Sequence, residues 1–325
     1  MATLKDVSEY AGVTVTTVSR VLNNRGYISE KTRKKVYDAM AKLNYQPNEI
    51  ARSLLRKKSN IIGIIVPSVS HPFFGELTEK IEYYAYENGY KILLCNSHLN
   101  SLKEREYVDM LRSHKVDGII MGSHTLRVDE YLSLNMPMVT IDRRISGSIP
   151  FIASDNFQGG KLATQFLIKN GCKKIALICG NLNLDMLSNK RYEAFLVEAV
   201  NSNVEHITIQ TEIDVFKYNQ YEKLVYDMFY EYPNIDGVFV SGDLMAMHVL
   251  KACGELKKRV PEDIKIVGYD DIRISSIVFP QLTTIHQPIE EMARLAVELI
   301  IKQINNDEVS YSNILPVSLI KRGSV

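Results

Sequence analysis

Residues 4–23 read LKDVSEYAGVTVTTVSRVLN, and this stretch decides the fold of the N-terminal part of the chain. Apolar residues recur at helical spacing from Leu4 to Ala11, and Gly12 then ends the run as a helix-ending residue does. Thr14 is a candidate N-cap for a second helix over 15–23. Two short helices joined by a tight turn are typical of the helix-turn-helix, whose second helix enters the major groove of DNA.

The outer face of the second helix keeps Thr16, Thr17, Ser19 and Arg20, which are hydrogen-bonding side chains suited to DNA. Ser29 then opens a third helix whose apolar stripe packs back onto the first two. A generic three-helix bundle is the alternative, but it leaves the polar face of the second helix unexplained.

The segment 47–58 is basic and too short to form a stable isolated helix. Small residues at Ala51 and Ser53 beside Leu54 suit a helix that lies in the minor groove and wedges a side chain between base pairs. A basic linker is the bland alternative.

Charge divides the chain in the same place. Residues 1–60 hold 12 Lys and Arg against 5 Asp and Glu, leaving 27 against 33 for the rest of the 325 residues. A basic leader on a slightly acidic body is typical of a nucleic-acid-binding head on a separate domain. A solvated charged face is the alternative interpretation.

Composition excludes several classes of protein. With 46% hydrophobic and 24% charged residues, the chain resembles neither a disordered protein nor a coiled-coil rod. It has no apolar run of bilayer length and no signal peptide, so a cytoplasmic protein without a membrane partner is expected. The four cysteines lack C-x-x-C spacing, which favours reduced structural thiols. Neither a cofactor nor a metal is expected.

Beyond residue 60, strand-length apolar runs alternate with helical stretches. The predicted strands are 61–66, 90–95, 118–121, 138–141, 174–178, 237–240 and 264–267, and helices are expected at 74–87, 104–113, 160–170 and 243–255. This alternation predicts an α/β fold with doubly wound parallel sheets.

Ligands of such sheets bind at the carboxyl ends of the strands, where this sequence repeatedly places polar or aromatic residues. Neither G-x-G-x-x-G after a strand nor G-x-x-x-x-G-K-[ST] is present. A sugar needs directional hydrogen bonds from charged groups and an aromatic face for its C–H side. The side chains that fit are Asp142, Asp155, Asp270, Arg191, Phe73 and Phe74. A glycosidase also uses paired carboxylates, but that function leaves the basic head unexplained.

The motifs at 4–7, 11–13, 17–23, 45–48 and 51–54 resemble those of the lactose-repressor family of bacterial transcriptional regulators. The resemblance implies that Val15, Thr16 and Arg20 read bases, and that Ala51 and Leu54 open the central minor groove. The predicted DNA-binding set is completed by Lys5, Thr17, Ser19, Asn23, Tyr27, Asn48 and Arg52. A homodimer on a palindromic operator is implied, with the protein on the nucleoid when DNA-bound. The absence of a heptad segment after Val325 favours a dimer over a tetramer.

The same resemblance covers the body of the chain, which is similar in fold to periplasmic sugar-binding proteins. It implies a helix-turn-helix domain at 1–46, a hinge helix at 47–59 and a sugar-binding and dimerisation core at 60–325. One lobe of the core is expected at 60–158 and 288–316, and the other at 159–287 and 317–325.

Carried over by motif, the expected sugar-binding residues are Phe73, Phe74, Asp142, Asp155, Arg191, Phe216, Asp270 and Gln287. Two departures from the family pattern stand out: Ala194 stands where the Arg191 motif usually has glycine, and Gly242-Asp243 replaces a common Asn-Asp. The pocket aromatic is either Phe216 or Tyr218. Asp142 is equally well interpreted as a structural cap, and His71 as a loop residue.

Within the family, stretches such as 103–111 and 154–157 are most similar to sucrose-operon repressors of Gram-positive bacteria. The expected inducer is sucrose, a phosphorylated sucrose or a fructose derivative, and Arg143, Arg144 and Lys190 are candidates for binding a phosphate beside Arg191. The alternatives are another sugar such as ribose, a ligand that acts as a corepressor, a partner protein as the signal, a sugar-processing enzyme and a transport component.

Overall fold

The computed structural model describes residues 2–47, 58–123, 125–211 and 218–325. The chain divides into two compact units, residues 1–59 and 60–325. No helix in these described ranges is long and apolar enough to cross a membrane.

The first unit consists of α1 (Leu4–Ala11), α2 (Val15–Leu22) and α3 (Glu30–Lys42). Each helix begins at a hydroxyl N-cap, respectively Thr3, Thr14 and Ser29, which accepts a hydrogen bond from the first turn. Gly12 ends α1 with φ of 65°, a left-handed conformation that glycine adopts without steric cost. The small core of the unit is formed by Val7, Ala11, Val18, Val21, Val36 and Ala39.

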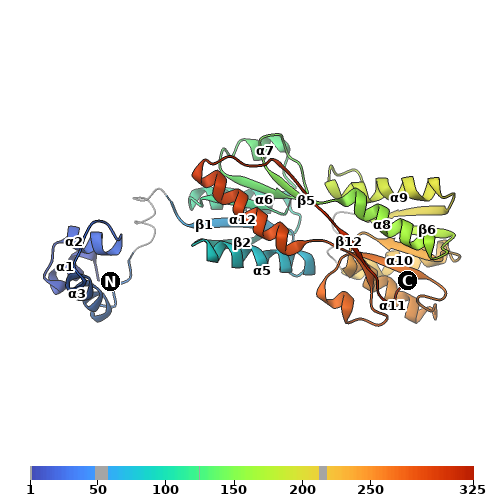
Figure 1. The fold of residues 1–325 in the computed structure, drawn as a ribbon, viewed down its shortest axis with the longest axis horizontal. Coiled ribbons are helices and arrows are strands. Elements are labelled where there is room, and N and C mark those ends of the chain that lie inside the picture. Colours follow the sequence, from blue (N-terminus) through green and yellow to red (C-terminus); the bar gives the residue numbers. More distant parts are fainter. Residues whose placement is uncertain (1, 48–57, 124, 212–217) are drawn as a thin grey trace. The chain divides into compact units, whose positions relative to one another are not determined.

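The second unit contains two six-stranded sheets with helices on both faces (Figure 1). The first sheet has the order β11-β5-β4-β3-β1-β2, and its paired strands all run parallel. Its strands are β1 (Ile61–Val66), β2 (Lys91–Asn96), β3 (Gly118–Met121), β4 (Met138–Ile141), β5 (Phe151–Ser154) and β11 (Ser312–Leu315). We call this sheet and its helices the N-lobe.

The helices of the N-lobe are α5 (Pro72–Glu87), α6 (Ser101–Ser113), α7 (Val128–Leu132) and α12 (Ile289–Asn305). Alternate residues of β1 point to opposite faces, so Ile64 packs with α5 and α12 whereas Ile65 packs with α6 and α7. Burial on both faces explains why this strand is an uninterrupted apolar run.

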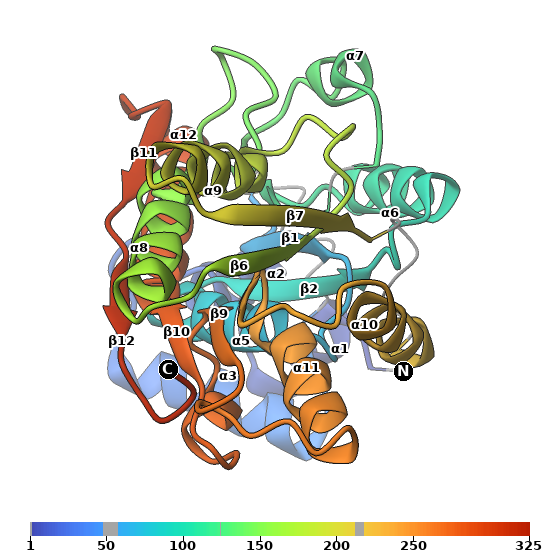
Figure 2. The same cartoon turned by 90° about the vertical axis from the view of Figure 1, so that its right-hand side faces the viewer.

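The second sheet, with its helices, forms the C-lobe and has the order β12-β10-β9-β8-β6-β7. Its strands are β6 (Lys174–Cys179), β7 (Glu205–Gln210), β8 (Gly237–Val240), β9 (Lys265–Asp270), β10 (Thr283–His286) and β12 (Ser318–Ile320). Only the β10–β12 pair is antiparallel. On one face lie α8 (Asn156–Lys169) and α9 (Lys190–Asn201), and on the other α10 (Tyr218–Glu231) and α11 (Asp243–Glu255) (Figure 2).

The chain passes between the two sheets three times, from β5 to α8, from β10 to α12 and from β11 to β12. Ser154 ends β5 and His286 ends β10, each just before one of the first two crossings. Residues far apart in the sequence therefore meet where the lobes adjoin.

Five strands of the structure have no counterpart among the predicted strands, namely β5, β7, β10, β11 and β12. Most of them lack the continuous apolar pattern, because β7, β11 and β12 are partly exposed and β10 buries threonines. The predicted helices are all present. The helix predicted at 243–255 has the bounds of α11, whereas α5, α6 and α8 start earlier than predicted, at Pro72, Ser101 and Asn156.

Candidate DNA-reading face and ligand cavity

The exposed face of α2 carries Val15, Thr16 and Arg20 of the predicted DNA-binding set. Val15 is 43% exposed although it is apolar, because the buried face of the helix belongs to Val18 and Val21. An exposed valine next to a threonine and an arginine is suited to contact base edges and thymine methyl groups.

Two further members of that set, Thr17 and Asn23, form hydrogen bonds at the two ends of α2. The Thr17 hydroxyl lies 2.9 Å from the Thr14 hydroxyl, and the Asn23 side chain donates to the Ser19 carbonyl at 2.8 Å. Tyr27 is 99% exposed after α2, and exposed Lys5 lies 3.9 Å from Glu9. The predicted hinge residues Asn48, Ala51, Arg52 and Leu54 lie outside the described residues.

A cavity of about 220 Å³ lies between the two lobes. From the N-lobe it is lined by the start of α5 and the ends of β3 and β4, and from the C-lobe by α9 and the ends of β8 and β9. The structure brings six of the predicted residues into its wall: Phe73, Phe74, Asp142, Arg191, Asp270 and Gln287. The rings of Phe73 and Phe74 meet edge to face at 5.1 Å.

The Arg191 guanidinium is held on three sides. Its Nε donates to Asn156 Oδ1 at 2.7 Å, and its Nη1 donates to the Ser241 carbonyl at 2.8 Å. Its plane also lies 3.5 Å from the centre of the Tyr269 ring, which is a cation–π contact. These contacts fix the orientation of the guanidinium, and only 7% of the surface of Arg191 is exposed.

Asp142 follows β4 with φ of 56°, and its Oδ1 accepts from Asn156 Nδ2 at 2.7 Å. Asn156 therefore connects Asp142 to Arg191 through one amide. Burial raises the pKa of Asp142 above its usual value, while Arg191 and the hydrogen bonds from Asn156 and Ser188 act in the opposite direction.

Asp270 ends β9 and accepts a 2.6 Å hydrogen bond from Gln287 Nε2. The Gln287 carbonyl accepts in turn from the Ser154 hydroxyl at 2.7 Å, which ties the second crossing to the first. Burial raises the pKa of Asp270 to about 8, and the charge of Asp243 adds to the effect. A protonated carboxyl group carries an O–H donor as well as acceptor oxygens.

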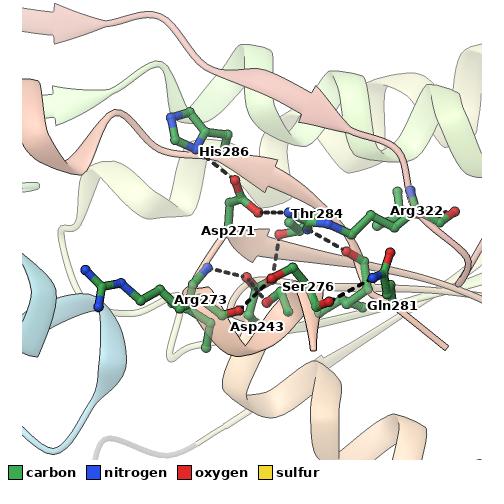
Figure 3. Close-up of polar contacts among 12 residues, drawn as sticks. Asp243, Asp271, Arg273, Ser276, Gln281, Thr284, His286 and Arg322 are labelled. Carbon is green, nitrogen blue, oxygen red and sulfur yellow. Dashed lines mark hydrogen bonds and ion pairs between the residues drawn. The ribbon is translucent and has the colours of Figure 1, made fainter. Parts of the chain in front are cut away.

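Asp243 is fully buried at the start of α11, behind the cavity wall. Its carboxylate accepts from the Ile272 N–H at 3.0 Å, the Ser275 hydroxyl at 2.7 Å and the Thr284 hydroxyl at 2.5 Å (Figure 3). A Cβ at Gly268 would collide with this carboxylate, so β9 needs glycine there. Asp243 thus joins α11, β10 and the loop after β9.

Asp271 follows Asp270 and is clamped by the side chains of Arg322 and His286 (Figure 3). Its Oδ1 accepts from Arg322 Nη2 at 2.6 Å, and its Oδ2 lies 3.0 Å from His286 Nδ1. Asp270 and Asp271 both have left-handed backbones, with φ of 115° and 60°. Such conformations are costly, so the clamp helps to hold the turn that aims Asp270 at the cavity.

The structure does not bring Asp155 into the cavity wall. Its Oδ1 accepts from the Gln158 N–H at 2.9 Å and caps α8. Phe216 lies outside the described residues, and the side chain of Tyr218 does too. Arg143 lies 5.9 Å from the Tyr131 ring, Arg144 and Lys190 are exposed, and none of the three lines the cavity.

Two residues at this site, His71 and Asn156, are absent from the predicted sugar-binding set. His71, interpreted as a loop residue, precedes α5 and lines the cavity, and burial lowers its pKa to about 4. Asn156 is not one of the predicted sugar-binding residues, although it holds Arg191 and Asp142 in place. Its position next to the N-cap of α8 was the available signal.

The described residues contain no group of three or more His, Cys, Asp and Glu side chains that could hold a metal ion. The four cysteines are free and buried, and burial raises the pKa of the Cys95 thiol to about 11. The cavity is thus lined by carboxyl, guanidinium, amide and aromatic groups.

Comparisons with known proteins give two family matches within the chain. Residues 3–48 match the model for bacterial regulatory proteins of the lacI family, and residues 164–325 match a periplasmic binding protein-like domain. A sucrose operon repressor of Streptococcus mutans is 39% identical over 325 residues, covering both chains fully. A ribose operon repressor of Halalkalibacterium halodurans is 38% identical over 323 residues, covering 99% of this chain and 96% of the relative.

Solved structures of regulators are also similar to this chain. The lac repressor dimer bound to operator and the anti-inducer ONPF superposes with a TM-score of 0.86 at 30% identity, covering 99% of this chain and 98% of the other. A LacI family regulator from Enterococcus faecium with bound ribose gives 0.73 at 28% identity, covering 81% and 98%.

Proposed function

The chain belongs to the lacI family of bacterial transcriptional regulators, and from this premise we propose that it represses a carbohydrate-utilisation operon until a sugar releases it from the operator. It is a DNA-binding, sugar-responsive repressor rather than an enzyme. The observation that carries the proposal is a cavity of sugar-binding groups between two lobes, in a chain that also exposes Thr16 and Arg20 on a helix-turn-helix.

In this proposal residues 1–46 read DNA, 47–59 form the hinge and 60–325 bind the sugar and the second subunit. Two-fold symmetry of the homodimer requires a nearly palindromic operator. The protein works in the cytoplasm, on the nucleoid when bound to DNA.

The sugar acts by favouring one arrangement of the lobes. A ligand bound between Phe73 on one lobe and Arg191 on the other draws the lobes together and shifts the N-lobes across the dimer interface. The hinge segments then no longer pack in the minor groove. Coupling of about 1–3 kcal/mol between the two sites is sufficient for a 5- to 150-fold change in operator affinity.

Arg191→Ala tests this coupling in the full-length dimer. Fluorescence anisotropy with a labelled operator is expected to show unchanged DNA binding without sugar and loss of release with sugar. Lys190→Ala is the matched control, because Lys190 is exposed and does not line the cavity. Normal release of the Arg191 variant would exclude this site. Tighter DNA binding with sugar in the wild type would make the ligand a corepressor, and chemical conversion of the sugar would favour an enzyme.

A further inference from the structure

We propose that the effector is a neutral sugar of a single ring, without a phosphate group. This rests on the proposed function, because it names the class of ligand for the same cavity. The sequence alone left phosphorylated sugars and disaccharides such as sucrose as alternatives, and the proposal excludes both.

The size of the cavity limits the ligand. At about 220 Å³ it is smaller than the roughly 300–1,000 Å³ of pockets that enclose drug-sized ligands. Its apolar wall is formed by Phe73, Phe74, Ile141 and Met186, enough to cover the C–H side of one sugar ring. A second ring would extend beyond this volume toward the open side of the cavity, where it would gain little contact with the apolar wall.

The charges of the wall disfavour a phosphate. Among the described lining residues, the acidic groups Asp142 and Asp270 face one guanidinium, that of Arg191. His71 is uncharged at neutral pH, because burial lowers its pKa to about 4. A phosphate carries about two negative charges, and Arg191 is the only permanent cation among the described lining residues to balance them. Asp270 adds no positive charge when it is protonated, and an ionised Asp142 would repel the phosphate.

The one guanidinium is already committed. Two of its three nitrogens donate to Asn156 and to the Ser241 carbonyl, and its face covers Tyr269. Arginine binds phosphate best through two parallel N–H donors, and the pair formed by Nε and Nη2 is no longer free because Nε donates to Asn156. The N–H groups left on Nη1 and Nη2 can still donate to ligand hydroxyls.

The helix N-termini at the cavity do not replace the missing cation. A helix N-terminus attracts anions, and α11 begins at the cavity beside Gly242. A Cβ at Gly242 would lie 3.7 Å from Asp270 Oδ2, so the carboxyl group of Asp270 already faces that terminus. The other helix, α5, has Pro72 in its first turn and therefore lacks one N–H donor there.

Calorimetric titration of the full-length protein tests the proposal with D-ribose, D-fructose and D-glucose, their phosphate esters, sucrose and sucrose 6-phosphate. We expect at least one free monosaccharide to bind, with its phosphate ester and sucrose each at least 10-fold weaker. Tighter binding of any phosphate ester or of sucrose overturns the proposal.

Asp142→Asn tests the charge argument directly, because it removes a carboxyl group and keeps its shape. The ratio of affinities, phosphate ester over free sugar, should rise about 10-fold in this variant. Asp155→Asn is the matched control, since Asp155 caps α8 outside the cavity and should leave the ratio unchanged. An unchanged ratio in Asp142→Asn would show that the wall charges do not select the ligand.

Operator release measured in the same samples separates this inference from the proposed function. If sucrose or a phosphorylated sugar binds best and releases the operator, the function stands and the inference fails. If a monosaccharide binds best but tightens operator binding, the inference stands and the ligand is a corepressor. If no sugar in the panel binds, both are overturned.

Discussion

Arg20 lies exposed on α2, where a long, always charged side chain can reach a guanine edge. Arg20→Ala should reduce the preference for operator over random duplex by about 1–3 kcal/mol, because the lost contact carries sequence information. Anisotropy titrations of both duplexes at one salt concentration measure it. Lys35→Ala, which removes an exposed charge on α3, should weaken both duplexes alike. If Arg20→Ala weakened binding to operator and random duplex equally, as Lys35→Ala is expected to do, Arg20 would not read bases.

Asp270 makes the stability of the protein depend on pH. Because burial raises its pKa to about 8, the folded chain binds this proton more tightly than the unfolded chain does. Its stabilising contribution is therefore present at low pH and is lost as the pH rises toward 8. In the folded chain Asp243, with a pKa of about 6, and His71, with a pKa of about 4, are largely deprotonated above pH 6.5. The unfolded chain still releases part of a proton from His71 just above pH 6.5, which offsets a small part of the loss due to Asp270.

The thermal midpoint of the wild type should accordingly fall between pH 6.5 and pH 8, by an amount equivalent to about 1 kcal/mol. Asp270→Asn should remove most of this fall, whereas Asp155→Asn should keep it. A fall of the same size in both variants would assign the pH dependence to other groups.

Two adjacent residues show how far the sequence predicts the site. The spacing after β5 indicates a polar cluster at Asp155 and Asn156, but not which of them turns inward. The start of α8 decides it, because the N-cap position directs Asp155 to the Gln158 N–H and leaves Asn156 facing Arg191. Such pairings between residues 35 positions apart depend on tertiary packing.

At the scale of elements, the sequence predicts the central strands except β5 and β10, and among the edge strands it predicts only β2. β1 and β6 lie between two layers of helices, so their apolar runs are uninterrupted. β10 is also central but carries Thr283 and Thr284, whose hydroxyls bond to Arg322 and Asp243. Its polar residues are buried because partners exist in other elements, and a local pattern does not contain that information.

Arg322 connects the short edge strand β12 to the rest of the C-lobe. It donates to Asp271 and to the Leu282 carbonyl, and its own N–H donates to the Thr283 hydroxyl at 2.9 Å. Arg322→Met should lower the free energy of unfolding by roughly 2 kcal/mol, because Asp271 loses a charged hydrogen-bond partner. Sugar affinity should fall as well, because the Asp270–Asp271 turn is less restrained.

Lys321→Met is the matched control, since the Lys321 ammonium lies only over the Phe166 ring at 5.3 Å. Thermal midpoints and calorimetric titrations of the two variants check the prediction. If Arg322→Met lost stability without losing sugar affinity, the clamp would serve the fold alone.

At the scale of the whole molecule, the two sheets and the helix-turn-helix were predictable because each rests on a repeated pattern. The fold of the core and the family followed from motifs spread over its length. The exact sugar did not follow, because relatives named for sucrose and for ribose are 39% and 38% identical to the chain. Ligand choice depends on a few wall residues that contribute little to overall identity.

The proposed homodimer needs an apolar surface on the core, and the loop before β10 offers one. Ile277 is 76% exposed and Phe279 is 97% exposed, which is unusual for neighbouring large apolar residues. We expect Phe279 to pack against the second subunit, so Phe279→Asp should shift the protein toward monomers. Because a palindromic operator engages two heads at once, operator affinity should fall with it, although each head keeps its own contacts.

Sedimentation velocity at micromolar protein, together with operator titrations, checks this expectation. Val200→Asp is the control, because Val200 is 63% exposed near the end of α9 and is equally apolar. A Phe279 variant that remains dimeric would place the interface elsewhere on the core. A monomeric variant that still binds the full operator with unchanged affinity would separate DNA reading from dimerisation, and the requirement for two-fold symmetry would then be wrong.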